Sequence, residues 1–161
     1  ESLEAAVKAA GADLAAPLSM GDDTPDLGDR DARLTVRPAA TDRIARWFHL
    51  GACALDATIA GRGPEATASV VQLWPEHFDY GIDLAAAPGV RTNLGAAAGD
   101  GYYDEPYLYV GPWDAGRPGP TEYWNAPFGA VLRRSELDVA DDPVHRAVEF
   151  FLQGISALRS G

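Results

Sequence analysis

The chain has 161 residues, of which 47% are hydrophobic and 23% charged, a composition typical of a folded globular protein rather than a disordered one. Its formal net charge is −11, because 13 Lys and Arg stand against 24 Asp and Glu. Such a charge repels nucleic-acid phosphates and anionic lipid head groups, and no apolar run approaches the roughly 20 residues that span a bilayer. The sequence therefore predicts a soluble protein without nucleic-acid or membrane partners.

Residue usage suggests where the protein functions. Cys53 is the only cysteine, which excludes an internal disulfide and favours the reducing cytoplasm. Lys8 is the only lysine beside twelve arginines, a bias that indicates a bacterium with a GC-rich genome. The chain begins at Glu1 without the features of a signal peptide, so we expect the C-terminal part of a longer protein.

The first 40 residues predict little regular structure. Ser2 can cap a short helix with an apolar stripe formed by Leu3, Val7, Ala10 and Leu14. Residues 13–33 are rich in Asp, Gly and Pro and predict a loop, and residues 34–36 predict a short strand that ends before Pro38.

The middle of the chain changes from a helical to a strand period. Thr41 is a plausible N-cap, and apolar residues recur at helical spacing until Gly61. Residues 70–74 form a compact apolar run that predicts a buried strand. From Phe78 to Leu84 apolar and polar residues alternate, which predicts a strand with one face in the core and the other wet or in a site.

The second half predicts a sheet followed by a helix. Pro88–Gly89 marks a turn, and we expect strands at 92–96, 107–110 and 128–132 around an irregular Gly- and Pro-rich segment, 111–120. Asp142 and Pro143 predict the start of an amphipathic helix. Its apolar stripe is Val144, Ala147, Val148, Phe151, Leu152, Ile155 and Leu158.

The order of these elements predicts the fold class. Consecutive strands favour antiparallel pairing with the helices gathered on one side. We therefore expect an α+β fold, an antiparallel sheet with two or three helices packed on one face. The whole chain, 1–161, is predicted to be a single domain, with 1–40 as a peripheral helix, loop and short strand and 41–161 as the core.

The segment 73–79 carries the strongest candidate for chemistry. On an extended strand His77 and Asp79 share a face about 7 Å apart, so both can reach one metal ion or one substrate. Both are candidate catalytic residues, as base or metal ligand and its partner. Asp100, in an acidic glycine-containing loop, is the candidate third metal ligand. The alternatives are a histidine that only hydrogen-bonds its neighbours and a solvated acidic turn.

Aromatic residues in the second half suggest a ligand groove. Rings with polar tips beside carboxylates and an amide combine stacking with hydrogen bonds, as a polar small ligand requires. The candidate ligand-binding residues are Trp113, Trp124, Asn125, Tyr103 and Glu105. The alternative is that several of these rings belong to the core.

A third cluster lies on the helix after Thr41. His49, Cys53 and Asp56 are spaced i, i+4 and i+7 and share one side of that helix. A metal site or a Cys–His nucleophile pair can be built at this spacing, although a buried Cys53 acting as a small hydrophobe explains it equally.

Three motifs resemble those of a family of uncharacterised actinobacterial proteins: LWPEHFD at 73–79, EPYLYVGPW at 105–113 and WNAPFG at 124–129. The chain is more distantly similar to a bacterial domain of unknown function. The resemblance covers roughly 41–158 and supplies no activity. It implies that family members carry a further N-terminal region. It also places these residues at recurrent motif positions: His77, Asp79, Asp100, Glu105 and Asn125.

Three functions remain open from the sequence. The first is a non-catalytic binding or interaction domain for a polar small molecule or a protein partner. The second is a metal-dependent or acid–base hydrolase that uses His77 and nearby carboxylates. The third is a purely structural domain, in which His77 would be buried, paired and far from any cavity.

Overall fold

The computed structural model describes residues 1–13, 15, 28–62 and 67–160. Contacts divide the chain into two units, Glu1–Arg43 and Ile44–Gly161. The division lies close to the boundary at residue 41 that the sequence suggests. The residues that follow it form the sheet, and the first unit is described separately.

The first unit contains α1 (Leu3–Ala9), whose N-terminus is capped as expected. The Ser2 hydroxyl oxygen accepts a hydrogen bond from the Ala5 N–H at 3.2 Å. The predicted strand at 34–36 is wrong, because these residues pair with no described strand and the side chains of Leu34 and Val36 are exposed. Leu14 and most of the predicted loop at 13–33 lie outside the described residues.

Helix α2 (Pro38–Ala60) confirms the predicted long helix and begins a turn earlier than Thr41. Proline suits the first turn of a helix because its missing N–H would have no intrahelical acceptor there. Within the second unit α2 buries Trp47, Ala54 and Leu55.

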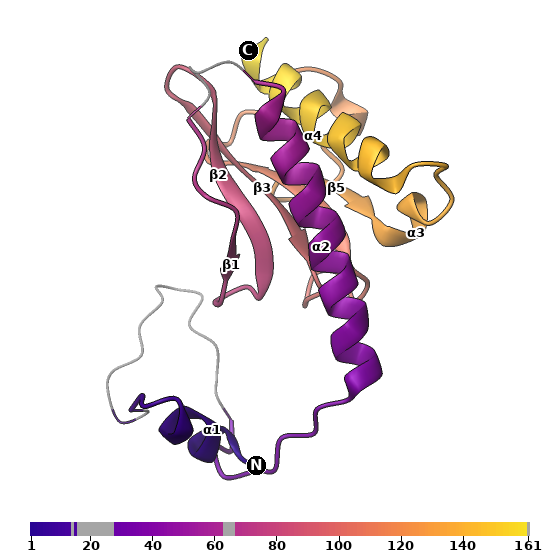
Figure 1. Ribbon diagram of the computed structural model, residues 1–161. Coiled ribbons are helices and arrows are strands. Elements are labelled where there is room, and N and C mark those ends of the chain that lie inside the picture. Colours follow the sequence, from indigo (N-terminus) through magenta and orange to yellow (C-terminus); the bar gives the residue numbers. More distant parts are fainter. Residues whose placement is uncertain (14, 16–27, 63–66, 161) are drawn as a thin grey trace. The chain divides into compact units, whose positions relative to one another are not determined.

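The sheet has five strands in chain order, each antiparallel to the next (Figure 1). They are β1 (Gln72–Trp74), β2 (Asp79–Ala87), β3 (Val90–Ala97), β4 (Tyr107–Pro112) and β5 (Ala130–Arg133). The chain continues through α3 (Arg134–Leu137) to α4 (Pro143–Arg159), and a short 3-10 helix, η1 (Thr121–Tyr123), precedes β5. The predicted α+β fold is confirmed.

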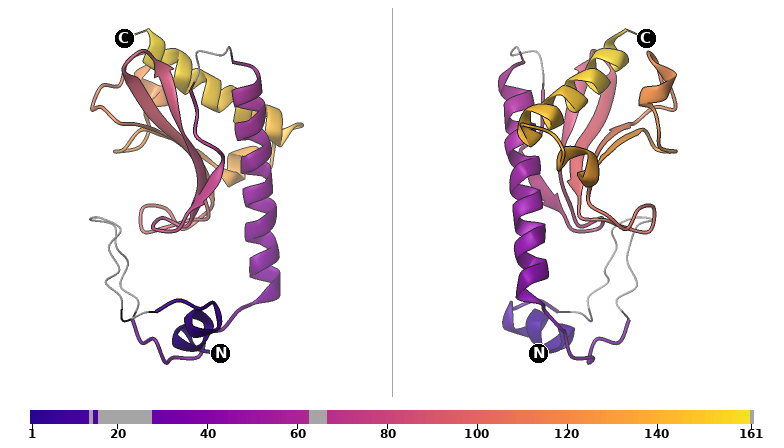
Figure 2. Two further views of the ribbon diagram at one scale, coloured as in Figure 1. Left: turned by 60° about the vertical axis from the view of Figure 1, so that its left-hand side comes forward. Right: turned by 90° about the vertical axis from the view of Figure 1, so that its right-hand side faces the viewer.

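Only one face of the sheet carries the main hydrophobic core. Its buried side chains are Ile82, Leu84, Leu94, Leu108, Val110 and Leu132. Helices α2 and α4 pack on this face, and both views of Figure 2 show them on the same side of the sheet. We use the term open face for the opposite side, which carries Asp79, Gly81, Gly95, Ala97, Tyr107 and Tyr109, as the alternation of side chains along strands requires.

Strand β1 differs from its prediction. The run at 70–74 was expected to be buried, but Val70 is 75% exposed and Leu73 is 42% exposed. The reason is position: β1 pairs with β2 alone and forms an edge of the sheet. An apolar run by itself does not distinguish an edge strand from a central one.

Helix α4 confirms its predicted start. The Asp142 carboxylate accepts a hydrogen bond from the His145 N–H at 3.0 Å, and Pro143 occupies the first turn. The predicted apolar stripe packs on the sheet through Phe151 and Ile155, whereas Leu152 is 44% exposed. The two short helices α3 and η1 were not predicted, since each is about one turn long.

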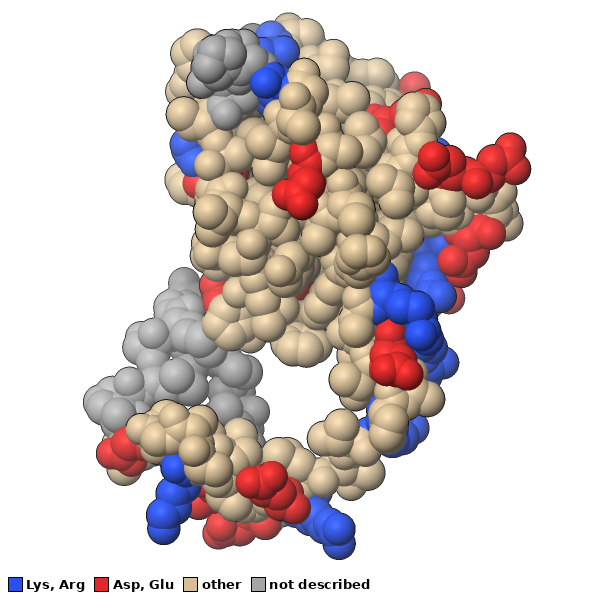
Figure 3. Space-filling view, in the orientation of Figure 1, with Lys and Arg blue, Asp and Glu red and all other residues tan. Residues whose placement is uncertain are grey.

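Two surface properties follow from this arrangement. Among the described residues, no helix combines the length and apolar character needed to cross a membrane. In Figure 3 most of the visible face carries neither acidic nor basic side chains, and several of its basic side chains lie next to acidic ones.

The close contact between α2 and β3 gives a first testable prediction. A Cβ added at Gly51 would lie 2.5 Å from the Cβ of Ala96. Overpacking of this kind costs about 1–3 kcal/mol, more than alanine gains over glycine in a helix. We expect Gly51→Ala to lower the free energy of unfolding by about 1 kcal/mol in urea titrations.

Gly61→Ala, at the end of the same helix, is the matched control. A Cβ at Gly61 meets its nearest atoms at 3.7 and 4.0 Å, so little change is expected. A stabilised Gly51→Ala protein would contradict the close packing of α2 on β3.

Candidate functional site

A cavity of about 310 Å³ lies on the open face of the sheet. We call it the Asp79 pocket. It is lined by His77, Asp79, Ala97, Asp100, Tyr107, Tyr109, Gly111 and Phe128. Strands β2, β3 and β4 supply its floor, and the loops that follow β1, β3 and β4 supply the remaining residues. The three candidate catalytic and metal-binding residues of this region, His77, Asp79 and Asp100, thus line one cavity.

Asp79 is the most unusual residue of this pocket. It is only 5% exposed, although it is the first residue of a strand. One carboxylate oxygen, Oδ2, accepts a hydrogen bond from the Tyr109 hydroxyl. The other, Oδ1, is buried and has no hydrogen-bond partner among the described residues. Buried polar atoms are nearly always paired, so an unpaired carboxylate oxygen on a residue that lines a cavity indicates a place for a ligand.

Two glycines make the Tyr109–Asp79 hydrogen bond possible. Gly81, Gly95 and Tyr109 are neighbours in the register of β2, β3 and β4. A Cβ at Gly95 would lie 2.5 Å from the Tyr109 ring, and one at Gly81 would lie 3.1 Å from its hydroxyl oxygen. The Tyr109 ring therefore lies flat across β3, and only glycine leaves room for it there.

Burial controls the ionisation of Asp79. It raises the pKa of this carboxyl above the ordinary value of 3.8, because a charged group loses hydration energy when it leaves water. The hydrogen bond from Tyr109 and the charge of His77 oppose this effect without cancelling it. Burial likewise raises the pKa of the Tyr109 hydroxyl, which therefore remains a donor at neutral pH.

Asp100 has the opposite character. Burial acts to raise its pKa, but hydrogen bonds outweigh this effect and hold the pKa below 3.8. The donors are the Tyr107 hydroxyl at 2.5 Å and the backbone N–H groups of Tyr102 and Tyr103 at 2.8 and 3.0 Å. The pocket thus combines one aspartate that ionises readily with one that ionises reluctantly.

His77 reaches the pocket from a turn and not from a strand. The prediction that His77 and Asp79 share one face of an extended strand is wrong, because β2 begins only at Asp79. Between them Phe78 has a φ of 50°, a left-handed conformation that costs a non-glycine residue about 1–2 kcal/mol. His77 is exposed and lines the cavity, whereas a purely structural role required it to be buried and remote from any cavity.

Aromatic rings form much of the remaining wall, and most of them were not predicted as site residues. Tyr107 packs against Tyr109 and Phe128 with ring centroids 6.4 Å apart in each pair, and Phe128 also contacts Tyr102 at 5.0 Å. Burial raises the pKa of the Tyr107 hydroxyl, as do its hydrogen bond to Asp100 and that residue's charge. The alternation of Tyr107 and Tyr109 with Leu108 was the available signal that both rings face away from the core.

The residues of the predicted ligand groove lie outside the Asp79 pocket, and the groove stays a prediction. Trp113 is 61% exposed and donates its indole N–H to the Asn93 side chain at 3.0 Å. Trp124 donates its indole N–H to the Pro118 carbonyl at 2.7 Å, beneath Arg117. Neither ring is among the described residues that line the Asp79 pocket.

The other predicted ligand residues serve nearby structure. The Asn125 side chain forms two hydrogen bonds with the backbone of Val131, at 3.0 and 2.8 Å, and so fixes the loop to β5. Tyr103 lies under the Arg133 guanidinium, whose central carbon is 4.5 Å from the ring centroid. Glu105 is exposed beside the start of β4. These three do not line the pocket either, within the part of the chain that is described.

The predicted metal and thiol sites gain no further support. Among the described residues, no group of three or more His, Cys, Asp or Glu side chains is arranged to hold a metal ion. The metal site at His77, Asp79 and Asp100 stays a prediction. On α2 the Cys53 sulfur lies 3.8 Å from Nε2 of His49, while Asp56 is exposed.

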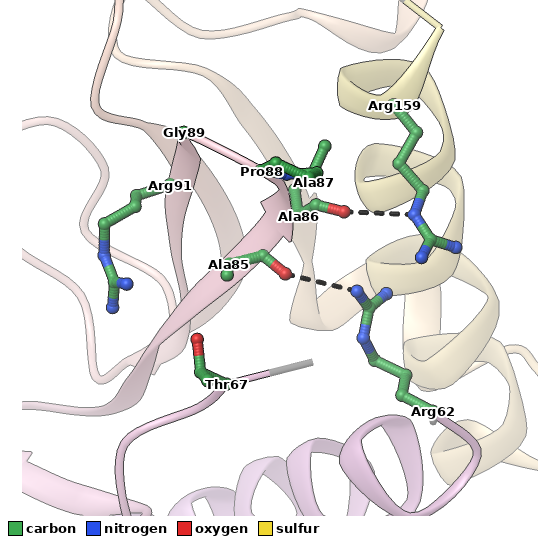
Figure 4. Close-up of a pocket in the computed structure, with 9 residues that line it drawn as sticks. All are labelled: Arg62, Thr67, Ala85, Ala86, Ala87, Pro88, Gly89, Arg91 and Arg159. Carbon is green, nitrogen blue, oxygen red and sulfur yellow. Dashed lines mark hydrogen bonds between the residues drawn. The ribbon is translucent and has the colours of Figure 1, made fainter. Parts of the chain in front are cut away.

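A second cavity, of about 390 Å³, lies at the β2–β3 hairpin and is lined in part by Arg62, Arg91 and Arg159 (Figure 4). Arg62 and Arg159 donate to the carbonyls of Ala85 and Ala86 at 3.2 and 3.0 Å, where β2 has its register irregularity.

The arginines of this hairpin cavity do not converge on a common point. Figure 4 shows Arg91 on the other side of β2 from Arg62 and Arg159, and Arg91 is paired with Asp83. Arg62 and Arg159 also lie at the C-terminal ends of α2 and α4, where the helix dipole disfavours an anion. We interpret both arginines as groups that fasten the helix ends to the sheet.

The fold and the pocket define an α+β protein with an antiparallel five-stranded meander and a polar cavity on its open face. No protein-family model, curated protein or solved structure matches the chain. The resemblance to the actinobacterial family stays a prediction.

The hydrogen bond between Tyr109 and Asp79 is tested by a matched pair of variants. Tyr109→Phe removes the donor to a buried carboxylate and should lower the free energy of unfolding by about 1–3 kcal/mol. Tyr107→Phe removes a donor to Asp100, which is exposed and keeps two backbone donors, so a loss below about 1 kcal/mol is expected. Equal losses in urea unfolding at neutral pH would show that Asp79 does not depend on Tyr109.

The two aspartates should also affect pH-dependent stability with opposite signs. The pKa of Asp79 is raised in the folded state. Its contribution to the free energy of unfolding, measured as wild type relative to Asp79→Asn, is therefore largest below pH 3.8 and declines as the pH rises through the folded-state pKa. The pKa of Asp100 is lowered, so its contribution relative to Asp100→Asn is present above 3.8 and is lost as pH falls.

Urea unfolding of wild type and both variants across the acidic range measures these differences. Wild-type stability that increases with pH relative to Asp79→Asn would contradict the burial of the Asp79 carboxylate. The Asp100→Asn series controls for general effects of acid on the protein.

Proposed function

We propose that this domain is a non-catalytic binding module whose Asp79 pocket holds a polar small molecule. The observation that carries the proposal is the buried Oδ1 of Asp79, which has no hydrogen-bond partner among the described residues. A buried acceptor without a partner costs about 1–3 kcal/mol, and a ligand donor would recover that free energy. The protein would therefore be more stable with the ligand bound.

The shape and lining of the cavity support a ligand of modest size. Its volume, about 310 Å³, lies at the lower end of the range for small-molecule sites. Such sites combine an apolar or aromatic wall with a few polar groups that fix orientation. Here Tyr107, Tyr109 and Phe128 supply rings, and two aspartates supply the polar groups.

Binding at this pocket is tested by screening polar fragments with backbone amide NMR shifts as the readout. We expect hits whose largest shifts fall on His77, Asp79, Ala97 and Gly111. Gly111→Val is the blocking variant, because a Cβ there meets only the Tyr109 ring at 4.0 Å and the added methyl groups occupy the cavity. It should abolish these hits.

Gly116→Val is the matched control. Gly116 has no atoms within 4 Å of an added Cβ and lines a different cavity, of about 470 Å³, near Arg117 and Pro118. Hits lost in Gly116→Val but kept in Gly111→Val would place the ligand near the tryptophan-bearing loops instead. The absence of any fragment shift at the Asp79 pocket would refute the proposed function.

Acid–base catalysis is the second candidate, and one observation favours it. Asp79 has a raised pKa in a cavity that also contains His77, and perturbed carboxyl groups often serve as general acids. A panel of chromogenic esters, phosphates and glycosides tests this candidate. Turnover that is lost in both Asp79→Asn and His77→Gln would establish an enzyme, and stoichiometric metal in elemental analysis would make it a metalloenzyme.

A further inference from the structure

We infer that the ligand of the Asp79 pocket is an organic ammonium ion that donates an N–H to Oδ1 of Asp79. This inference rests on the proposed function, since it names the chemical class of the ligand of the same pocket. Three properties of the described lining support it: the direction of its hydrogen bonds, its charge and its aromatic rings.

The hydrogen-bonding groups of the pocket mainly accept. The hydroxyls of Tyr109 and Tyr107 already donate to Asp79 and Asp100, and burial keeps both phenols protonated. A phenol has only one hydrogen to donate, so these side chains offer acceptor oxygens to a ligand. A ligand that donates hydrogen bonds therefore fits, whereas a carboxylate or phosphate would meet oxygen atoms like its own.

The charge of the pocket further restricts which hydrogen-bond-donating ligand fits. Two carboxyl groups line the cavity, and no Lys or Arg is among the described lining residues. Asp100 is readily ionised, whereas burial disfavours the charge on Asp79. A positively charged ligand would compensate that desolvation, as a buried carboxylate requires a paired charge. A neutral alcohol would satisfy Oδ1 without supplying this compensation.

Oδ1 is itself buried, so an incoming donor reaches it through a turn of the carboxylate. The terminal torsion of an aspartate is broad, which permits such a turn, and the Tyr109 hydroxyl can follow or exchange its acceptor oxygen. Asp79 is an intrinsic part of the pocket wall, so no backbone movement is needed to bring it to the ligand.

The rings add an attraction that is specific for cations. Tyr107, Tyr109 and Phe128 line the same cavity as the two carboxylates. A cation over an aromatic face gains about 0.5–2 kcal/mol, more when water is excluded. His77 is the lining side chain that can compete, because its positive charge also acts on both carboxylates.

Four small probes of similar size test the inference by NMR titration of the whole chain: benzylammonium, benzyltrimethylammonium, benzyl alcohol and benzoate. We expect benzylammonium to shift the amides of the Asp79 pocket and to bind at least about tenfold more tightly than the others. Asp79→Asn should reduce its affinity about tenfold and leave benzyl alcohol unchanged. His77→Gln should retain or strengthen benzylammonium binding, because it removes a competing charge.

The outcomes separate this inference from the proposed function. Tighter binding of benzyl alcohol or benzoate at the pocket would overturn the ammonium ligand and leave a small-molecule site in place. Equal binding of benzyltrimethylammonium would overturn the N–H donation to Asp79. Asp100→Asn changes an exposed residue and provides a second charge variant in case Asp79→Asn unfolds. If the Asp100→Asn protein binds benzylammonium with unchanged affinity, the charge argument is contradicted. Failure of every polar fragment at the pocket would instead refute the function itself.

Discussion

The hydrogen bond from Tyr109 to Asp79 is the interaction on which the open face depends. Tyr109 starts on β4 and crosses β3 to reach a carboxylate at the beginning of β2. That path exists only because Gly95 and Gly81 carry no side chains beneath the ring. The result is an aspartate that is only 5% exposed, with one carboxylate oxygen paired and the other unpaired among the described residues. Sheet register, two glycines and one phenol therefore create the polar cavity together.

The two aspartates of the cavity show how local environment divides one residue type into two roles. Asp100 receives three hydrogen bonds in an exposed loop, and they stabilise its charge. Asp79 receives one and is buried, so its charge is destabilised. A ligand that brings positive charge would favour the ionised form of Asp79, and its binding would lower the pKa of this carboxyl. The turn at Phe78, which brings His77 to the same cavity, has a strained backbone conformation, and such conformations cluster at functional sites.

The sequence predicted the fold more fully than the site. Strong periodicity defined α2, α4 and the alternating strand at β2, and the alternation correctly placed Asp79 opposite the core. Position within the sheet is not encoded in a short apolar run, so the edge strand β1 was mistaken for a buried one. Predicting the pocket would have required the pairing of the strands, because Tyr109 comes within reach of Asp79 only through the register of three strands. Local composition instead pointed to Trp113, Trp124 and Asn125, whose indole and amide groups bond to nearby loop and strand atoms.

The most direct test of this account is an NMR titration of the Asp79 carboxyl carbon in the protein without ligand. A buried carboxylate whose second oxygen lacks a partner should titrate with a pKa above 3.8, and the Tyr109→Phe change should raise it further, since it removes the donor that stabilises the charge. A midpoint at or below 3.8 would mean that the charge is already hydrated or paired. In that case Asp79 would not be the unsatisfied centre of a ligand site.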